Sequence, residues 1–88
     1  MPLVTLYGTA TCPYCIQAKR LLAAKGVKLQ EIRVDLEPGQ RRIMQTRSGR
    51  RTVPQIWIGE HHVGGFTDLR ALEEKGQLDA LLAADGAF

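Results

Sequence analysis

The sequence predicts a small α+β domain, a three-layer α/β/α sandwich in which a four-stranded mixed sheet carries helices on both faces. Short β-rich runs alternate with helical patterns through the first half of the chain. Two further β-rich runs are separated only by Gly59-Glu60, which predicts an antiparallel hairpin. The predicted order is β-α-β-α-β-β-α, and its first strand–helix–strand unit favours parallel strands with a right-handed crossover.

In the first half of the chain, Leu3–Tyr7 is apolar and contains Val and Thr, which predicts a buried strand. Apolar residues then recur at helical spacing over Ile16–Lys25, and Gly26 follows as the residue that ends the helix. The β-rich run Lys28–Val34 predicts the second strand.

The second half begins with a predicted turn, Asp35–Gly39, and a short helix, Gln40–Ser48, in which Ile43 and Met44 are expected to face inward. The remaining elements are two strands, a helix and a final helical turn. They are predicted at Gln55–Ile58, at His61–Val63, at Leu69–Lys75 with Thr67 or Asp68 as its cap, and around Leu78, Leu81 and Leu82.

Length and composition indicate one globular domain, 1–88, because 44% of the 88 residues are apolar and 24% are charged. No apolar run approaches the roughly 20 residues of a membrane span. The first residues lack the pattern of a signal peptide. We therefore expect a cytoplasmic monomer that does not associate with membranes.

The motif Cys12-Pro13-Tyr14-Cys15 stands where the first strand gives way to the first helix. A thiol at a helix N-terminus faces unpaired N–H groups and the positive end of the helix dipole, which favours thiolate over thiol. Cys15 lies one turn further along, where it can attack a disulfide formed at Cys12. A C-x-x-C motif in a strand–helix–strand context indicates redox chemistry.

Two other interpretations of this motif are weaker. The loop between Cys12 and Cys15 is too short for a disulfide there to stabilise the fold, and the chain contains no other cysteine. A zinc site needs four ligands, and His61 and His62 are adjacent on a predicted strand, so they point to opposite faces. We therefore expect no metal.

Two later stretches suit ligand binding. Thr52-Val53-Pro54 precedes a strand, and a cis peptide there would expose backbone groups that can pair with an extended peptide. The stretch from Gly64 to Asp68 places two glycines before a helix N-terminus, which attracts carboxylates, while the Asp68 carboxylate can hold an ammonium group. Two simpler interpretations remain open: Pro54 only marks the start of a strand, and the Gly64–Asp68 stretch only forms a capped turn.

Five arginines lie close together, and the formal net charge is +3. They are Arg41, Arg42, Arg47, Arg50 and Arg51. No nucleic-acid-binding motif accompanies them, so we expect no nucleic-acid partner. A solvated helix face and the attraction of a small anionic substrate both remain open.

Taken in order and spacing, these stretches resemble the glutaredoxin family, most closely the short bacterial dithiol glutaredoxins. The resemblance rests on Cys12-Pro13-Tyr14-Cys15, Lys25-Gly26-Val27, Arg47-Ser48-Gly49, Thr52-Val53-Pro54-Gln55-Ile56, Gly64-Gly65 and Asp68-Leu69. It covers nearly the whole chain. It implies a thioredoxin-like fold and a redox-active centre that reduces protein–glutathione mixed disulfides and protein disulfides, with roles in electron transport and cell redox homeostasis.

The resemblance also implies residue roles. Cys12 is the nucleophile, Cys15 is the resolving thiol, and glutathione is the reductant. In the implied glutathione site, Tyr14 flanks the tripeptide, and the Val53 backbone before a cis Pro54 pairs with its cysteinyl unit. The Thr67 backbone and the Asp68 side chain receive the γ-glutamyl end. Arg41 lies near the glycine carboxylate. Thr11, Thr52, Gly65 and Phe66 complete the predicted set.

Two positions depart from the family pattern. Thr9 stands where many members have a lysine that faces the glycine carboxylate, and Phe66 stands where many have a small residue or cysteine. Phe66 and Thr9 motivate an alternative, a redoxin that is reduced by thioredoxin reductase. A glutathione-ligated iron–sulfur carrier is a second alternative, which Pro13 disfavours because cluster-binding relatives usually have a smaller residue there.

Overall fold

A computed structural model describes residues 3–83 of the chain, which form four strands and four helices. In chain order the elements are β1 (Val4–Gly8), α1 (Pro13–Ala24), β2 (Leu29–Arg33), α2 (Pro38–Ser48), β3 (Gln55–Ile58), β4 (His61–Gly64), α3 (Phe66–Glu74) and α4 (Gln77–Ala83). The predicted element order is confirmed, and α4 is the final short helix that the leucines indicate. No helix in this described part is long and apolar enough to cross a membrane.

The strands form one mixed sheet in the order β2-β1-β3-β4. β1 and β2 are parallel, with Val4 opposite Leu29, whereas β1 and β3 are antiparallel, with Val4 opposite Ile58. β3 and β4 form the predicted hairpin, in which Trp57 lies opposite His62. The central position of β1 brings its end, and hence Cys12, beside the residues that precede β3.

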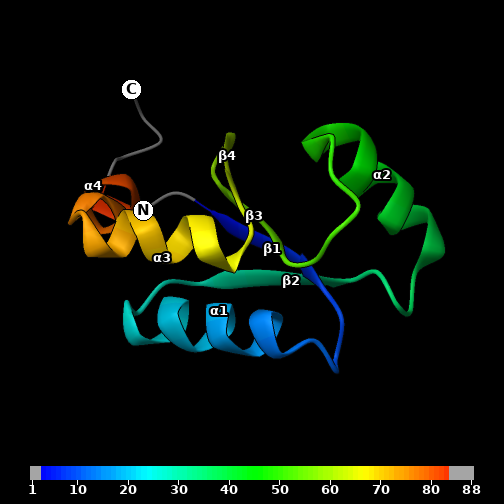
Figure 1. Cartoon of the computed structure of the whole chain (residues 1–88), viewed down its shortest axis with the longest axis horizontal. Coiled ribbons are helices and arrows are strands. Elements are labelled where there is room, and N and C mark those ends of the chain that lie inside the picture. Colours follow the sequence, from blue (N-terminus) through cyan, green and yellow to red (C-terminus); the bar gives the residue numbers. More distant parts are fainter. Residues whose placement is uncertain (1–2, 84–88) are drawn as a thin grey trace.

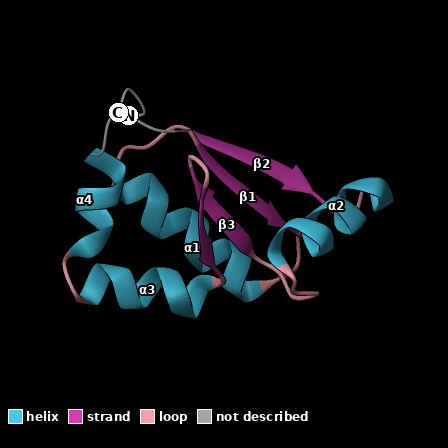
Figure 2. Cartoon of the chain, turned by 90° about the horizontal axis from the view of Figure 1, so that it is seen from above, coloured by secondary structure: helices cyan, strands magenta, loops and turns pink. Residues whose placement is uncertain are grey.

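Helices cover the two faces of this sheet unequally (Figures 1 and 2). α1, α3 and α4 lie against one face, here called the α1 face, and α2 lies against the other, the α2 face. Alternate residues of a strand point to opposite faces. Leu6 and Ile56 therefore pack on the α1 face, while Tyr7 and Trp57 pack on the α2 face.

The α1 face holds the larger core. Its buried residues are all aliphatic: Val4, Leu6, Ala18, Leu22, Ile56, Ile58, Leu69, Leu78 and Leu82. They come from two strands and three helices, so this cluster joins β1 to α4. Lys25, at the C-terminus of α1, adds ion pairs of 2.7 Å to Glu73 and 2.8 Å to Asp79.

The α2 face buries fewer residues, and they are different in kind. Tyr7, Val34, Met44 and Trp57 form its cluster, with the Tyr7 and Trp57 rings 5.3 Å apart in an edge-to-face arrangement. The Arg47 guanidinium lies 4.4 Å from the centre of the Trp57 ring and donates a 2.9 Å hydrogen bond to the Tyr7 hydroxyl. One arginine of the basic stretch thus has a packing role here.

Several predicted boundaries were wrong, and proline explains one of them. α2 begins at Pro38, earlier than the predicted start at Gln40, whereas α1 begins at Pro13, directly after Cys12, as expected for a thiol at a helix N-terminus. Proline fits the first helical position because its missing N–H is not needed there. The short predicted turn before α2 is therefore partly helix, and β2 is one residue shorter at each end than Lys28–Val34.

One prediction about side chains was half right, and another was wrong. Ile43 is 45% exposed, whereas Met44 is fully buried against the α2 face, so only one of the two faces inward. α3 begins at Phe66 with Gly65 as its N-cap, not after Thr67 or Asp68. The reason is that the Asp68 carboxylate reaches back from the first turn to the Gly65 N–H, 2.9 Å away.

Candidate active site

Cys12 is the N-cap residue of α1, directly before Pro13. Its carbonyl accepts the first hydrogen bond of the helix, from the Ile16 N–H at 3.1 Å. The thiol is half-buried and lies 3.7 Å from the carbonyl oxygen of Val53, to which it can donate. The two sequence motifs, 41 residues apart, therefore meet at this sulfur.

Cys15 has a different environment from Cys12. It lies in the first turn of α1 and is fully buried. Burial raises the pKa of the Cys15 thiol to about 11, and a hydrogen bond from the Thr9 backbone N–H opposes this effect. At neutral pH the Cys15 sulfur is thus a thiol shielded from solvent, which suits a group that reacts only after its neighbour.

A groove of about 380 Å³ lies beside Cys12. Its lining comes from α1, from the segment before β3 and from the start of α3: Tyr14, Arg50, Thr52, Val53, Pro54, Gly65, Phe66, Thr67 and Asp68. The Val53–Pro54 peptide is cis, as the resemblance implies. Tyr14 and Phe66 stack with their ring centres 6.3 Å apart, so one wall of the groove is aromatic.

A carboxylate marks the α3 end of the groove. Asp68 Oδ2 accepts hydrogen bonds of 2.9 Å from the Gly65 N–H and of 2.9 Å from Arg50 Nη1. These two contacts, the Gly65 N–H first, hold the pKa of the Asp68 carboxyl below its usual range. The groove is therefore charged at this end, with an anion and a cation side by side.

Glycine is required at the end of β4, next to this carboxylate. Gly64 has φ 113°, a conformation that side chains rarely adopt. A Cβ on Gly64 would also collide with Asp68 Oδ2. The close approach of the β4 backbone to the carboxylate explains the first glycine of the Gly64-Gly65 pair.

Eight of the ten predicted glutathione-binding residues line this groove, and two do not. Thr11 is exposed in the turn before Cys12, and Arg41 is partly buried on α2. Arg50 lines the groove instead and was not in the predicted set. Its position two residues before Thr52, inside the basic stretch, was the available signal.

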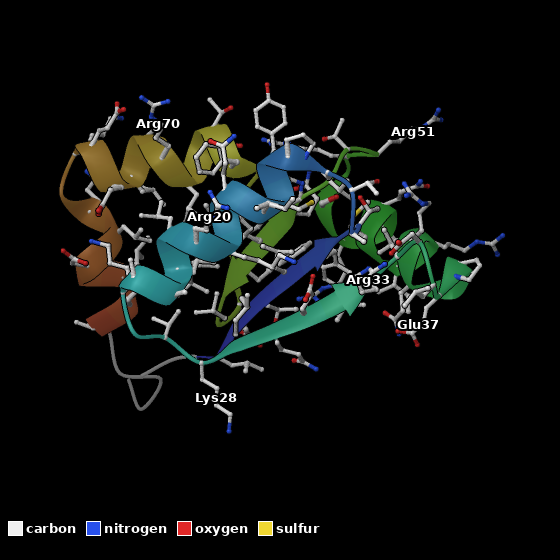
Figure 3. All side chains as sticks on the ribbon, turned by 90° about the horizontal axis from the view of Figure 1, so that it is seen from below. Arg20, Lys28, Arg33, Glu37, Arg51 and Arg70 are labelled. Atoms are coloured by element: carbon white, nitrogen blue, oxygen red, sulfur yellow. The ribbon has the colours of Figure 1, made fainter. Side chains whose placement is uncertain are left out.

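The remaining basic residues are dispersed. Arg51, Arg70 and Lys28 point outward from widely separated parts of the molecule (Figure 3). Because Arg47 packs on Trp57 and Arg50 lines the groove, these two arginines of the basic stretch have separate structural roles. Among residues 3–83, no group of three or more histidine, cysteine, aspartate or glutamate side chains is arranged to hold a metal ion.

A thioredoxin-like sheet with two cysteines at the start of α1, next to a cis proline, defines a dithiol redox protein. Comparison with known proteins gives the family. The glutaredoxin family model matches residues 4–63. A glutaredoxin of Pseudomonas aeruginosa is 60% identical over 84 residues, which cover 96% of this chain and all of that protein. Glutaredoxin 3 of Escherichia coli is 52% identical over 90% of this chain and 95% of its own length.

Comparison with solved structures supports the same family. The solution structure of a Brucella melitensis glutaredoxin is 54% identical and superposes with a TM-score of 0.82 over 93% of this chain and 89% of that one. A buckwheat glutaredoxin solved in complex with glutathione is 28% identical, with a TM-score of 0.84 over 90% of this chain and 74% of that one. This chain belongs to the glutaredoxin family, and it is a dithiol member, a glutathione-dependent thiol–disulfide oxidoreductase.

Proposed function

We propose that Cys12 attacks the glutathionyl sulfur of protein–glutathione mixed disulfides and that Cys15 resolves mixed disulfides formed with protein substrates. The observation that carries this proposal is the 3.7 Å contact between Cys12 Sγ and the Val53 carbonyl, because it joins the nucleophile to the groove. Cys12 is also the N-cap residue of α1, two residues before Tyr14, which lines the groove.

The single-cysteine route has two steps. The Cys12 thiolate forms a bond to the glutathionyl sulfur, the original S–S bond breaks, and the protein leaves as a thiolate that takes up a proton. A second glutathione thiolate then attacks the glutathionyl sulfur on Cys12, which releases oxidised glutathione and returns the Cys12 thiolate. Cys15 takes no part in this route.

The two-cysteine route uses the buried thiol. Cys12 attacks a protein disulfide and forms a mixed disulfide with one of its sulfurs. Cys15 then loses its proton and attacks Cys12 Sγ, so that a Cys12–Cys15 disulfide forms and the substrate leaves reduced. Two glutathione molecules restore the dithiol.

We infer that glutathione lies along the groove with its cysteinyl sulfur at Cys12. The Val53 backbone pairs with the cysteinyl unit, and Tyr14 and Phe66 flank it. Both protein hydrogen bonds to Asp68 fall on Oδ2, so Oδ1 is available to the γ-glutamyl ammonium. Arg50 supplies a cation for a nearby carboxylate. Because glutathione is the reductant, we propose that the protein acts in a reducing compartment, the cytosol.

The cysteine roles are tested by comparing Cys12→Ser with Cys15→Ser. We expect Cys12→Ser to abolish reduction of both a glutathionylated peptide and a protein disulfide. We expect Cys15→Ser to keep most of the first activity and lose the second. Equal losses in the two variants, on both substrates, would contradict the assignment.

The electron donor distinguishes this proposal from the alternative in which thioredoxin reductase is the donor. NADPH oxidation is measured with glutathione plus glutathione reductase and, separately, with thioredoxin reductase. We expect turnover with the first donor system and little with the second. A preference for thioredoxin reductase would replace the proposal.

A further inference from the structure

A chain of hydrogen bonds runs from β4 to the groove beneath its surface. His62 Nε2 lies 2.8 Å from Gln55 Oε1, and Gln55 Nε2 lies 3.0 Å from the Thr52 carbonyl and 3.3 Å from its hydroxyl. Gln55 is fully buried, yet no buried side-chain polar atom of the described residues lacks a partner. The chain of bonds thus satisfies an amide at the base of the groove.

The directions of these hydrogen bonds are determined by chemistry. A carbonyl oxygen only accepts, so the Gln55 atom next to the Thr52 carbonyl is the amide nitrogen and the one next to His62 is the oxygen. The His62 Nε2 must therefore carry a hydrogen. Burial, and next the Arg50 charge, lower the pKa of His62, so the neutral Nε2–H tautomer is the form that fits.

The Thr52 carbonyl belongs to the same peptide group as the Val53 N–H. That peptide is trans, so its C=O and N–H point in opposite directions. Holding the carbonyl inward, toward buried Gln55, turns the Val53 N–H outward on the groove side. The hydrogen bonds of the described residues include none from the Val53 N–H, which leaves it for a ligand.

We propose that His62 is a positioning residue, which acts through Gln55 to fix the Thr52–Val53 peptide plane so that the Val53 N–H faces the carbonyl of the cysteinyl unit of glutathione. His62 is held in turn by the packing of the α2 face. Its ring stacks on Trp57 at 4.6 Å, and the two residues are paired across the β3–β4 hairpin. This inference rests on the proposed placement of glutathione and deepens it.

The test measures the first step of the single-cysteine route, the attack of Cys12 on a mixed disulfide. It uses two substrates built on the same peptide. One peptide carries a glutathionyl disulfide, and the other carries a cysteaminyl disulfide, which has no peptide group to pair with Val53. Pre-reduced protein is mixed with each, and the second-order rate constant and its KM and kcat contributions are obtained from release of the peptide thiol. The variants are His62→Phe, which keeps a flat ring on Trp57, and His62→Gln, whose amide can replace the Nε2 donor.

We expect His62→Phe to slow the reaction of the glutathionyl peptide about tenfold, mainly through KM, which corresponds to about 1.4 kcal/mol. The cysteaminyl peptide should change less than about twofold, since it makes no such hydrogen bond. His62→Gln should restore most of the loss. His61→Phe, at the exposed neighbouring position of β4, is the matched control and should change neither rate.

Equal effects of His62→Phe on both peptides, or an effect on neither, would overturn the positioning role. If the unaltered protein itself does not prefer the glutathionyl peptide, the proposed glutathione site fails instead. The unaltered protein also gives a test without substitution: nitrogen NMR shifts of His62 should report the Nε2–H tautomer, and S-methylglutathione should shift the Val53 amide signal. An Nδ1–H tautomer, or an unmoved Val53 signal, would contradict the inference.

Discussion

The two faces of the sheet bury different chemistry. The α1 face is closed by nine aliphatic side chains from five elements, whereas the α2 face is closed by two aromatic rings, a methionine and a valine, with polar groups among them. Arg47, His62 and Gln55 all make directed contacts on or beside the α2 face. Aliphatic packing has no direction, but hydrogen bonds do.

This difference suggests a division of labour. The α1 face holds the chain together and carries the helix on which both cysteines stand. On the side of the α2 face, Gln55 hydrogen-bonds to Thr52 in the segment before β3, and that segment lines the groove. Substitutions on the first face should therefore change stability more than chemistry, and substitutions near the second should change both.

The largest effect is expected on the α1 face. Leu6→Ala removes a fully buried side chain from the middle of β1, and we expect a loss of about 2–5 kcal/mol in the free energy of unfolding. Chemical denaturation measures it. Leu36→Ala is the matched control because Leu36 is 68% exposed, and it should change stability by less than about 0.5 kcal/mol. Equal losses would show that the aliphatic cluster is not the main support.

The α2 face is tested at two adjacent residues of one helix. Met44→Ala should cost about 2–3 kcal/mol, at the lower end of the range for such changes because the smaller cluster has fewer contacts to lose. Ile43→Ala should cost little, since Ile43 is exposed. Denaturation curves of the two variants, with turnover of a glutathionylated peptide, compare them. Similar curves for both would mean that α2 contributes no specific packing.

Where the sequence predicted an element correctly, the signal was local. The short run Gln55–Ile58, with three consecutive apolar residues, placed a strand correctly, and helical spacing placed the core of α1. The inward residue of α2 could not be chosen from sequence, because Ile43 and Met44 are equally apolar and only packing on Tyr7 and Trp57 selects between them. Apolar periodicity predicts an element well and its phase poorly.

The active site was likewise predicted where its signals are local and missed where they depend on tertiary structure. The cysteines, Val53, Pro54 and Asp68 lie in motifs that can be read locally, and the structure brings them to one place. The bond between Gln55 and His62 depends on the register of β3 against β4, which no short motif contains. The capping role of Asp68 was assigned to the wrong position because its carboxylate acts on a residue three positions earlier.

A smaller effect is expected where the α1 face meets the active site. A Cβ on Gly8 would lie 2.9 Å from Cys15 Sγ and 2.9 Å from Leu6 Cδ2. Gly8→Ala should therefore cost about 1–3 kcal/mol in stability through overpacking. It should also slow formation of the Cys12–Cys15 disulfide while sparing attack by Cys12 on a glutathionyl substrate. Rapid-mixing measurements of the two steps separate these effects, and equal slowing of both would argue against a selective clash.

The smallest effect is expected at the start of α3, where electrostatics replaces packing. The pKa of Asp68 is depressed in the folded protein, so its ionised form contributes stability above the unfolded value of about 3.9. That contribution is lost as pH falls through the folded pKa. The carboxylate is 44% exposed and screened by water, so we expect less than about 1 kcal/mol. The stability difference between the unaltered protein and Asp68→Asn should thus be constant near neutral pH and shrink below about pH 4.

The control for this measurement lies on the same helix. Glu74 forms an exposed pair with Arg70 at 3.0 Å, and Glu74→Gln should change stability by less than about 0.5 kcal/mol. If Asp68→Asn is no more pH-dependent than Glu74→Gln, the Gly65 and Arg50 contacts do not stabilise the ionised carboxylate. Salt distinguishes the two contacts: high ionic strength should weaken the Arg50 pair and leave the Gly65 hydrogen bond, which is half-buried and local to the helix start, largely intact.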